Sequence, residues 1–212
     1  YNIYAKAVIL CAGGFAANPD MIAQYDSRWE GIGCSSSIGQ TGDGILMAQA
    51  VGADVAYMEN IRVNPSVYYE GDLRISMSPL RHNGAIMVNA EGKRFANEQG
   101  DYTETSAAIM EQTGKKAYMI FDKTLLNVGL INQYNEKGYF KSAPTLEGLA
   151  EEMGIDKTGL LETVEIYKGY VAANEDKDFG RTNLSIDFEN PDYYGLEISP
   201  AAQGTFGGLK VD

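Results

Sequence analysis

Residues 83–98 read NGAIMVNAEGKRFANE, and this stretch predicts a β-hairpin. An apolar, strand-like run precedes Glu91-Gly92, and a second run follows it. Strand-forming residues on both sides of a short segment that contains glycine are typical of a hairpin. Arg94 is expected on that hairpin. KAYMIFD at residues 116–122 predicts a further strand.

Helices are expected after these strands. TETSAAIMEQ at residues 103–112 predicts a short helix with Thr103 or Thr105 as its N-cap. Residues 145–154 and 157–175 predict two amphipathic helices. The second of these places one set of residues on a single face: Leu160, Leu161, Val164, Tyr167 and Val171. Residues 176–200 predict a loop with short strands. This mixture of strands and helices indicates an α+β fold.

The N-terminal part of the chain has a different pattern. AKAVILCAGGF at residues 5–15 is a short apolar run closed by Gly13-Gly14, which predicts a buried strand followed by a tight turn. Asn18 and Pro19 then have the properties of an N-cap and a first helical position. Apolar residues at helical spacing up to about Gly52 place TGDG, residues 41–44, at the N-terminus of a second helix.

Charge and composition exclude several classes of partner. The chain has 29 acidic and 17 basic residues in 212, a net charge of −12. Nucleic acid and anionic membrane surfaces would repel such a protein. No apolar run approaches the roughly 20 residues of a membrane span. Cys11 and Cys34 fit no zinc or CxxC spacing and are expected to be buried or half-buried thiols.

The single histidine, His82, cannot make a metal site or a catalytic triad alone. It is expected to be a loop or hydrogen-bonding residue, and no metal is predicted.

Two glycine-containing segments are open to two interpretations. Gly13-Gly14 is either a turn that a dinucleotide approaches closely or a structural turn. Residues 41–44 present either a ligand-binding helix N-terminus or an ordinary N-cap at Thr41 or Asp43. The nucleotide fingerprint GxGxxG is absent from the sequence. The chain also begins within a strand pattern at Tyr1 and stops at GGLKVD, which together suggest a fragment of a dinucleotide-binding protein.

Six motifs occur in an order that resembles the FAD-dependent fumarate reductase and succinate dehydrogenase flavoprotein family, which includes urocanate reductases and 3-ketosteroid dehydrogenases. They are AKAVILCAGGF (5–15), GQTGDGILMAQAVGA (39–53), NGAIMVNAEGKRFANE (83–98), DKDFGR (176–181), YYGLEISP (193–200) and TFGGLKVD (205–212). The resemblance implies part of a Rossmann-like FAD-binding domain at residues 1–58, a capping domain that binds substrate at 59–198, and a return to the FAD-binding domain at 199–212.

The same resemblance implies that FAD is the cofactor of the full-length protein. It would lie near Ala12, Gly13, Gly14, Thr41, Gly42, Asp43 and Gly44. The reaction would be hydride transfer between FAD and an activated carbon–carbon double bond. Tyr102 occupies the position of the family's proton-donating arginine. Arg81 is retained as a relay residue or substrate anchor. The 212-residue chain alone is expected to be inactive and to hold FAD weakly.

Several positions depart from the family pattern. Asn64 replaces a carboxylate-binding histidine and Ser78 replaces a relay glutamate, while Gln203, Gly204 and Thr205 stand in a stretch where the family has histidines. These changes favour an uncharged or singly charged enone or enoate over fumarate, because a dicarboxylate needs donors at both ends. They resemble the 3-ketosteroid dehydrogenase branch.

The expected partners are this unsaturated small molecule and an electron-donor domain or subunit outside the chain. Two alternatives stay open: a true fumarate reductase or succinate dehydrogenase flavoprotein, and a ligand-binding or degenerate flavoprotein without turnover.

Overall fold

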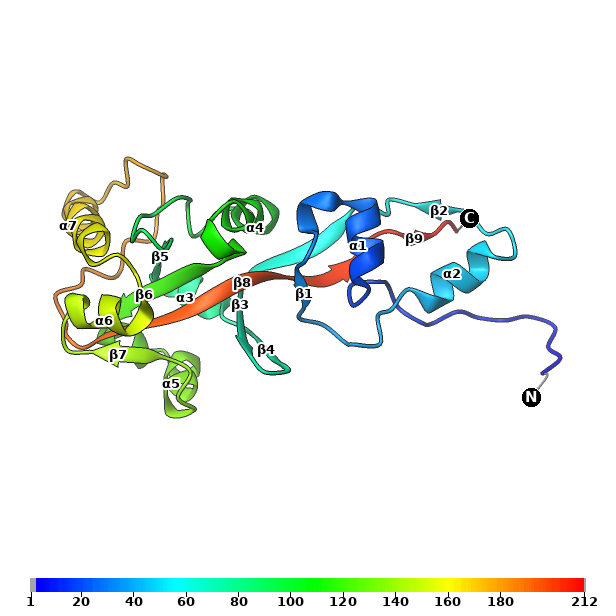
Figure 1. Cartoon of the computed structure of the whole chain (residues 1–212), viewed down its shortest axis with the longest axis horizontal. Coiled ribbons are helices and arrows are strands. Elements are labelled where there is room, and N and C mark those ends of the chain that lie inside the picture. The colour runs from blue at the N-terminus through cyan, green and yellow to red at the C-terminus, as the bar shows by residue number, and fades with distance from the viewer. Residues whose placement is uncertain (1–2, 212) are drawn as a thin grey trace. The chain divides into compact units, whose positions relative to one another are not determined.

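The computed structural model describes residues 3–211, which form two compact units (Figure 1). The first unit contains the chain up to Arg62 and resumes at Ala202; the second is Val63–Ala201. Strands β3 (Ile61–Glu70) and β8 (Tyr193–Thr205) each contribute residues to both units. The predicted boundaries at 58 and 199 lie a few residues from these positions, and the assignment of the units to FAD-binding and capping domains stays a prediction.

The second unit is built on a β-sheet whose strand order differs from the order of the strands along the chain. Its strands follow the order β4-β3-β8-β6-β5, where β4 is Leu73–Ser76, β6 is Ala117–Asp122 and β5 is Ile86–Val88. Strand β6 pairs antiparallel with both β5 and β8, as Figure 1 shows, and β7 (Lys141–Ala143) also pairs with β8. All six residues of β6 are buried, which places this strand at the centre of the core. The predicted strand at 116–122 is therefore confirmed.

Five helices accompany this sheet. They are α3 (Ser78–Asn83), α4 (Tyr102–Met110), α5 (Gly129–Glu136), α6 (Leu146–Met153) and α7 (Lys157–Ala173). Short 3₁₀ segments cover Thr113–Lys115 and Lys123–Asn127. The two predicted amphipathic helices are confirmed as α6 and α7. In α7, Leu160, Val164 and Tyr167 are buried, while Leu161 and Val171 are half-buried at the edge of the same face.

Three predictions for this unit need correction. The second strand of the hairpin is reduced to one bridge between Val88 and Arg94, because the chain turns inward there to bury the arginine. The N-cap of α4 is Asp101, whose carboxylate accepts hydrogen bonds from the backbone N–H groups of Thr103 and Glu104 at 2.7 and 3.2 Å. The aspartate competes better for these donors than a threonine further along the chain.

The third correction concerns the end of the segment predicted as a loop with short strands. Residues 174–192 are irregular, but β8 is 13 residues long. The sequence pattern does not predict this long strand, because glycine and proline are unfavourable within strands and occur here at Gly195, Pro200 and Gly204. Pairing with strands on both sides overrides that local preference.

The first unit contains the helices α1 (Pro19–Tyr25) and α2 (Asp43–Gln49), a 3₁₀ turn at Ser27–Trp29, and the strands β1 (Gly33–Cys34), β2 (Val55–Ala56) and β9 (Gly208–Leu209). Strand β2 pairs antiparallel with β9, and β1 pairs with β8. Asn18 is the predicted N-cap of α1, because its side-chain oxygen accepts from the backbone N–H of Met21 at 3.0 Å. Within residues 3–211, every helix falls short of the length and apolar character that crossing a bilayer would require.

The predicted strand over residues 5–11 is not formed. These residues have no regular structure, and Ile9 is 87% exposed. A strand requires a neighbour for its backbone N–H and C=O groups, and no strand within residues 3–211 pairs with this run. Cys11 is consequently exposed, contrary to the prediction, whereas Cys34 is half-buried as expected; both are free thiols.

We expect Gly159→Ala to lower the free energy of unfolding by about 1–3 kcal/mol, the range for overpacked sites. A Cβ at Gly159 would lie 1.9 Å from the carbonyl oxygen of Glu91, where α7 packs on the hairpin turn. Gly169, on the same helix, has no heavy atom within 4 Å of such a Cβ, so Gly169→Ala should stabilise by about 0.5–1 kcal/mol. Urea unfolding measures both, and equal effects of the two substitutions would contradict this packing.

Candidate functional site

Glycine backbone forms much of a pocket of 250 Å³ in the first unit. Its lining residues are Leu10, Ala12, Gly13, Gly14, Gly44, Ile45, Thr205, Gly207, Gly208 and Leu209. None of these side chains carries a charge, so an anionic ligand would meet no repelling carboxylate in the lining. The pocket is below the roughly 300–1,000 Å³ of typical ligand sites and would hold one portion of a dinucleotide.

Close contacts explain why glycine occupies these positions. Cβ atoms at Gly14 and Gly44 would lie 2.1 Å from Thr205 Oγ1 and 2.7 Å from Ala12 Cβ. The backbone N–H of Gly42 donates to the carbonyl of Gly14 at 3.1 Å, which joins the two predicted glycine segments. Ala12, Gly13, Gly14 and Gly44 line the pocket, so four of the seven predicted cofactor residues meet there.

The remaining three predicted cofactor residues lie beside the pocket without lining it. The carbonyl of Thr41 accepts from the side-chain amide of Asn18 at 2.8 Å. Gly42 is the N-cap of α2 in a left-handed conformation, φ +80°, and Asp43 is the first helical residue. The alternative in which Thr41 or Asp43 acts as N-cap is therefore wrong.

A polar cluster around Tyr102 lies within the second unit. Tyr102 is the first residue of α4, and its hydroxyl donates to Ser78 Oγ at 3.3 Å. His82 Nε2 lies 3.4 Å from the same hydroxyl oxygen. Ser78 and His82 are four residues apart on α3, so they occupy the same helix face.

Arg81 is the only fully buried cation of this cluster. Its guanidinium lies over the Tyr102 ring, 4.4 Å from the centroid, and Nη1 donates to the carbonyl of Gly100 at 3.1 Å. Among residues 3–211, Nε and Nη2 have no hydrogen-bond partner. Burial lowers the pKa of Arg81, and the neighbouring Tyr102 opposes this effect. Unpaired, buried N–H groups cost free energy, which marks them as functional candidates.

Hydroxyl groups extend the cluster toward Asn64. The Asn64 side-chain amide donates to Ser76 Oγ at 2.9 Å, and Ser76 Oγ lies 3.1 Å from Ser78 Oγ. The Asn64 side-chain oxygen accepts from the backbone N–H of Ser66 at 3.0 Å. The structure thus brings together four predicted site residues, Asn64, Ser78, Arg81 and Tyr102.

The other three predicted substrate residues belong to the first unit. Thr205 Oγ1 accepts from the backbone N–H of Phe15 at 3.4 Å, and Gln203 Oε1 is buried without a hydrogen-bond partner in the part of the chain that the structure describes. Gly204 has open space at its Cβ position.

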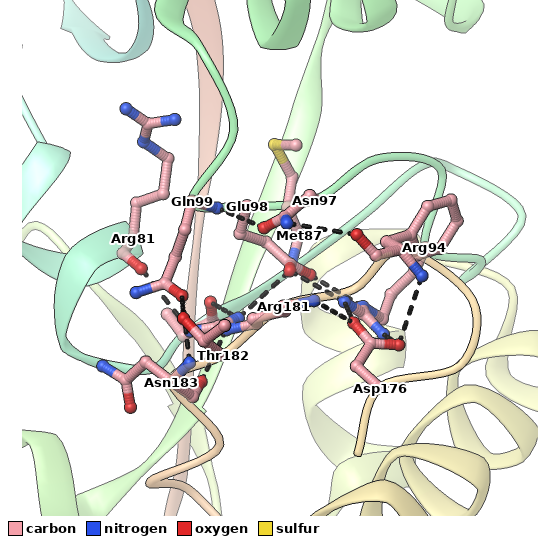
Figure 2. Close-up of polar contacts among 12 residues, drawn as sticks. Arg81, Met87, Arg94, Asn97, Glu98, Gln99, Asp176, Arg181, Thr182 and Asn183 are labelled. Carbon is pink, nitrogen blue, oxygen red and sulfur yellow. Dashed lines mark hydrogen bonds and ion pairs between the residues drawn. The ribbon is translucent and has the colours of Figure 1, made fainter.

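Sequence reasoning missed a buried ionic network, which we call the arginine–carboxylate network: Arg94, Glu98, Asp176 and Arg181 (Figure 2). Arg94 binds Glu98 and Asp176, both at 2.8 Å, and Arg181 binds Glu98 at 3.2 Å. The four side chains are at most 4% exposed. The sequence places Arg94 on a hairpin, and its i, i+4 spacing from Glu98 signals an ion pair only within a helix, which residues 94–98 do not form.

Each charge in this network is offset by opposite charge. Burial disfavours the charged form of Arg94, but Glu98 and Asp176 outweigh it and raise the arginine's pKa. Burial would raise the pKa of Asp176, but hydrogen bonds from Arg94 lower it below its usual value. Arg94 and Asp176 are therefore both ionised at neutral pH.

The loop that carries Arg181 also caps α3. The carbonyls of Arg81, His82 and Asn83 accept from the side chains of Arg181, Asn183 and Ser185 at 3.5, 2.8 and 3.0 Å. These are among the carbonyls that the end of a helix leaves without helical partners. Figure 2 shows the Arg81 guanidinium pointing away from the network while its backbone faces Arg181. The network and loop thereby hold the helix that carries Ser78, Arg81 and His82.

Comparisons with known proteins agree with the resemblance seen in the sequence. The profile of the family described as "FAD binding domain" matches residues 1–212. The chain is 38% identical over 213 residues to a fumarate reductase (cytochrome) of Shewanella frigidimarina, covering 100% of this chain and 37% of that protein. The chain therefore spans just over a third of this relative's length.

Two solved structures are similar to the chain. The open conformation of a flavocytochrome c3 fumarate reductase matches with a TM-score of 0.88 and 33% identity, over 98% of this chain and 37% of that one. The 3-ketosteroid Δ1-dehydrogenase of Sterolibacterium denitrificans matches with a TM-score of 0.75 and 29% identity, over 96% and 43%. The mixed fold of strands and helices is thus shared with these flavoproteins.

We expect Glu98→Gln to lower the free energy of unfolding by about 3–5 kcal/mol, because it removes the buried carboxylate that pairs with Arg181 and leaves Arg94 with Asp176 alone. Glu162→Gln is the matched control, since Glu162 pairs with Lys93 on the surface, where ion pairs contribute about 0–1 kcal/mol. Denaturant unfolding of both variants measures the difference. Equal stabilities would show that the arginine–carboxylate network contributes nothing beyond a surface pair.

Proposed function

The chain belongs to the FAD-binding domain family, and we propose that it acts within a longer flavoprotein that transfers a hydride between FAD and an activated carbon–carbon double bond. We assign the first unit to the FAD-binding domain and the second to a capping domain that binds substrate. The relatives' lengths support this proposal, because the chain covers only 37% of the Shewanella reductase. An electron-donor domain or subunit would lie outside this chain.

The cluster at Tyr102 is the observation that carries the proposal. Hydride addition to one carbon of a double bond leaves negative charge on the neighbouring carbon, which a proton must neutralise. The Tyr102 hydroxyl is a proton donor held by Ser78, and the guanidinium of Arg81 lies against its ring. A cation at 4.4 Å from the ring lowers the electrostatic cost of the phenolate that remains after the proton leaves.

The pocket of the first unit supports the cofactor assignment. Bound there, FAD would exchange the hydride. Gly13 and Gly14 would allow the cofactor to approach the backbone closely, and Gly44 and Ala12 would form a further part of the lining. Thr41, Gly42 and Asp43 would support this lining from the start of α2.

The charges of the cluster indicate the class of substrate. Within the described residues of the second unit, Arg81 gives this cluster a guanidinium that contacts Tyr102. The other groups of the cluster are the hydroxyls of Ser76 and Ser78, the amide of Asn64 and the imidazole of His82. A dicarboxylate requires charged donors at both ends, whereas this cluster offers one cation. We therefore propose an enone or a monocarboxylic enoate.

Fumarate remains the second candidate, because Nε and Nη2 of Arg81 are two adjacent unpaired donors that match one carboxylate. Anaerobic reoxidation of the reduced, FAD-loaded full-length protein distinguishes the candidates. Fumarate, urocanate, cinnamate and 1,4-androstadiene-3,17-dione form the panel, with flavin absorbance as the readout. We expect a monocarboxylate or the steroid enone to reoxidise the flavin fastest. Fastest reoxidation by fumarate would establish the second candidate, and a protein purified without flavin would indicate a degenerate flavoprotein.

We expect Tyr102→Phe to slow this reoxidation by about 10²–10⁴-fold, the usual contribution of a positioned proton donor, while flavin content is unchanged. Tyr193→Phe is the matched control, because it removes a hydroxyl that donates to the Phe188 carbonyl, outside the Tyr102 cluster. A wild-type rate for Tyr102→Phe would remove this residue from the reaction.

A further inference from the structure

We propose that His82 is the proton-delivery residue for Tyr102, and that it connects the tyrosine hydroxyl to solvent after each turnover. This inference rests on the proposed role of Tyr102. After giving up its proton, a tyrosine must be reprotonated before it can act again. The structure provides a titratable side chain at the hydroxyl, since His82 Nε2 lies 3.4 Å from Tyr102 Oη.

The contacts of the Tyr102 hydroxyl with Ser78 and His82 lead in different directions. Ser78 continues through Ser76 to the amide of Asn64, which is 1% exposed. An amide neither gains nor loses a proton in the ordinary pH range, so this branch ends inside the protein. His82 is exposed, whereas Tyr102 is half-buried. The imidazole therefore stands between the hydroxyl and water, and histidine is the side chain best suited to exchange protons with water near neutral pH.

The backbone fixes His82 in this position. Its carbonyl accepts from the Asn183 side-chain amide at 2.8 Å, which ties the last turn of α3 to the loop of the arginine–carboxylate network. The rings of His82 and Tyr102 lie with centroids 6.3 Å apart and planes at 33°. A separation of 3.4 Å is long for a hydrogen bond, and such contacts commonly shorten when substrate binds.

The electrostatic surroundings make the His82 imidazolium a stronger acid. Burial, followed by the positive charge of Arg81, lowers the pKa of His82 below its ordinary value of 6.5. Among the described residues, Arg81 on its own helix and Tyr102 on α4 are the charged or titratable groups that face it, and Asn183 on the loop is neutral. An imidazolium that is slightly destabilised is a better acid toward a phenolate.

The proton transfers balance without a further reactant. The O–H bond of Tyr102 breaks as a C–H bond forms on the substrate, which leaves the phenolate. The Nε2–H bond of the His82 imidazolium then breaks and the tyrosine O–H bond forms again. Neutral His82 finally takes a proton from water. No electrons are exchanged in these steps, and the direction reverses if the protein oxidises a C–C single bond.

Chemical rescue tests this role in the reduced, FAD-loaded protein. His82→Ala opens space for free imidazole beside Tyr102, and His82→Gln keeps a polar side chain that cannot carry a proton. With the panel compound that reoxidises the wild type fastest, we expect both variants to be slowed about 10²-fold. Added imidazole should restore most of the rate to His82→Ala. It should not restore Tyr102→Phe, and the double variant Tyr102→Phe/His82→Gln should be no slower than Tyr102→Phe.

Two results would overturn the proposal. One is a wild-type rate for both His82 variants while Tyr102→Phe is slow, which would leave the role of Tyr102 intact. The other is a slower reoxidation in His82→Ala that added imidazole does not restore, together with a double variant that is slower than Tyr102→Phe. That result would indicate a structural role for His82. Asn83→Ala, on the same helix, is the control, because Asn83 donates to the Pro79 carbonyl and should keep the wild-type rate. A wild-type rate for Tyr102→Phe would instead refute the proposed function.

Discussion

Two buried arginines share the carboxylate of Glu98, and the second unit depends on these ion pairs. Removing charged groups from water costs several kcal/mol per ion, which is repaid only when partners and geometry are complete. Here Arg94 has Glu98 and Asp176, and Arg181 has Glu98 together with the Ala85 carbonyl at 2.8 Å. Arg94 and Glu98 pair with each other within the segment after the hairpin turn, and each also binds an opposite charge on the irregular loop after α7. The ionic network therefore holds together two segments that lie some 80 residues apart in the chain.

This constraint reaches the candidate site through the end of α3. A six-residue helix contributes little stability on its own, and its terminal carbonyls require partners. Side chains at alternate positions of the loop, Arg181, Asn183 and Ser185, supply them. The helix is thus held by the loop that the ionic network fixes. Because Ser78, Arg81 and His82 lie on this helix, the geometry at the Tyr102 hydroxyl follows from interactions that never touch it.

The elements predicted correctly from the sequence are those set by local residue patterns. Those that depend on contacts with distant segments of the chain were missed. The amphipathic helices α6 and α7, the strand at 117–122 and the Asn18 cap follow from spacing and side-chain chemistry within a few residues. Residues 5–11 have the composition of a strand but lack a described neighbour, and β8 is a strand despite its glycines and proline because neighbours pair with it. At the site, Asn64, Ser78, Arg81 and Tyr102 were predicted through a family resemblance, and the structure brings them together. His82 was expected only as a loop or hydrogen-bonding residue and Glu98 was not singled out, because both side chains contact residues at positions that periodicity does not relate.

Three features of the Tyr102 cluster are physically linked. The resemblance implies a glutamate where this chain has Ser78, and such a carboxylate would pair with the nearby guanidinium. With serine there, Nε and Nη2 of Arg81 are left without partners in a buried position. A buried arginine in this state is costly unless negative charge develops beside it. The phenolate of Tyr102, lying under the guanidinium, and a substrate carboxylate are the two groups in the proposed reaction that would carry such charge. Ser78 in place of the acid, Tyr102 at the proton-donor position and the retained Arg81 are thus consistent with one change of mechanism. In it, the arginine provides electrostatic stabilisation and the proton passes through the tyrosine.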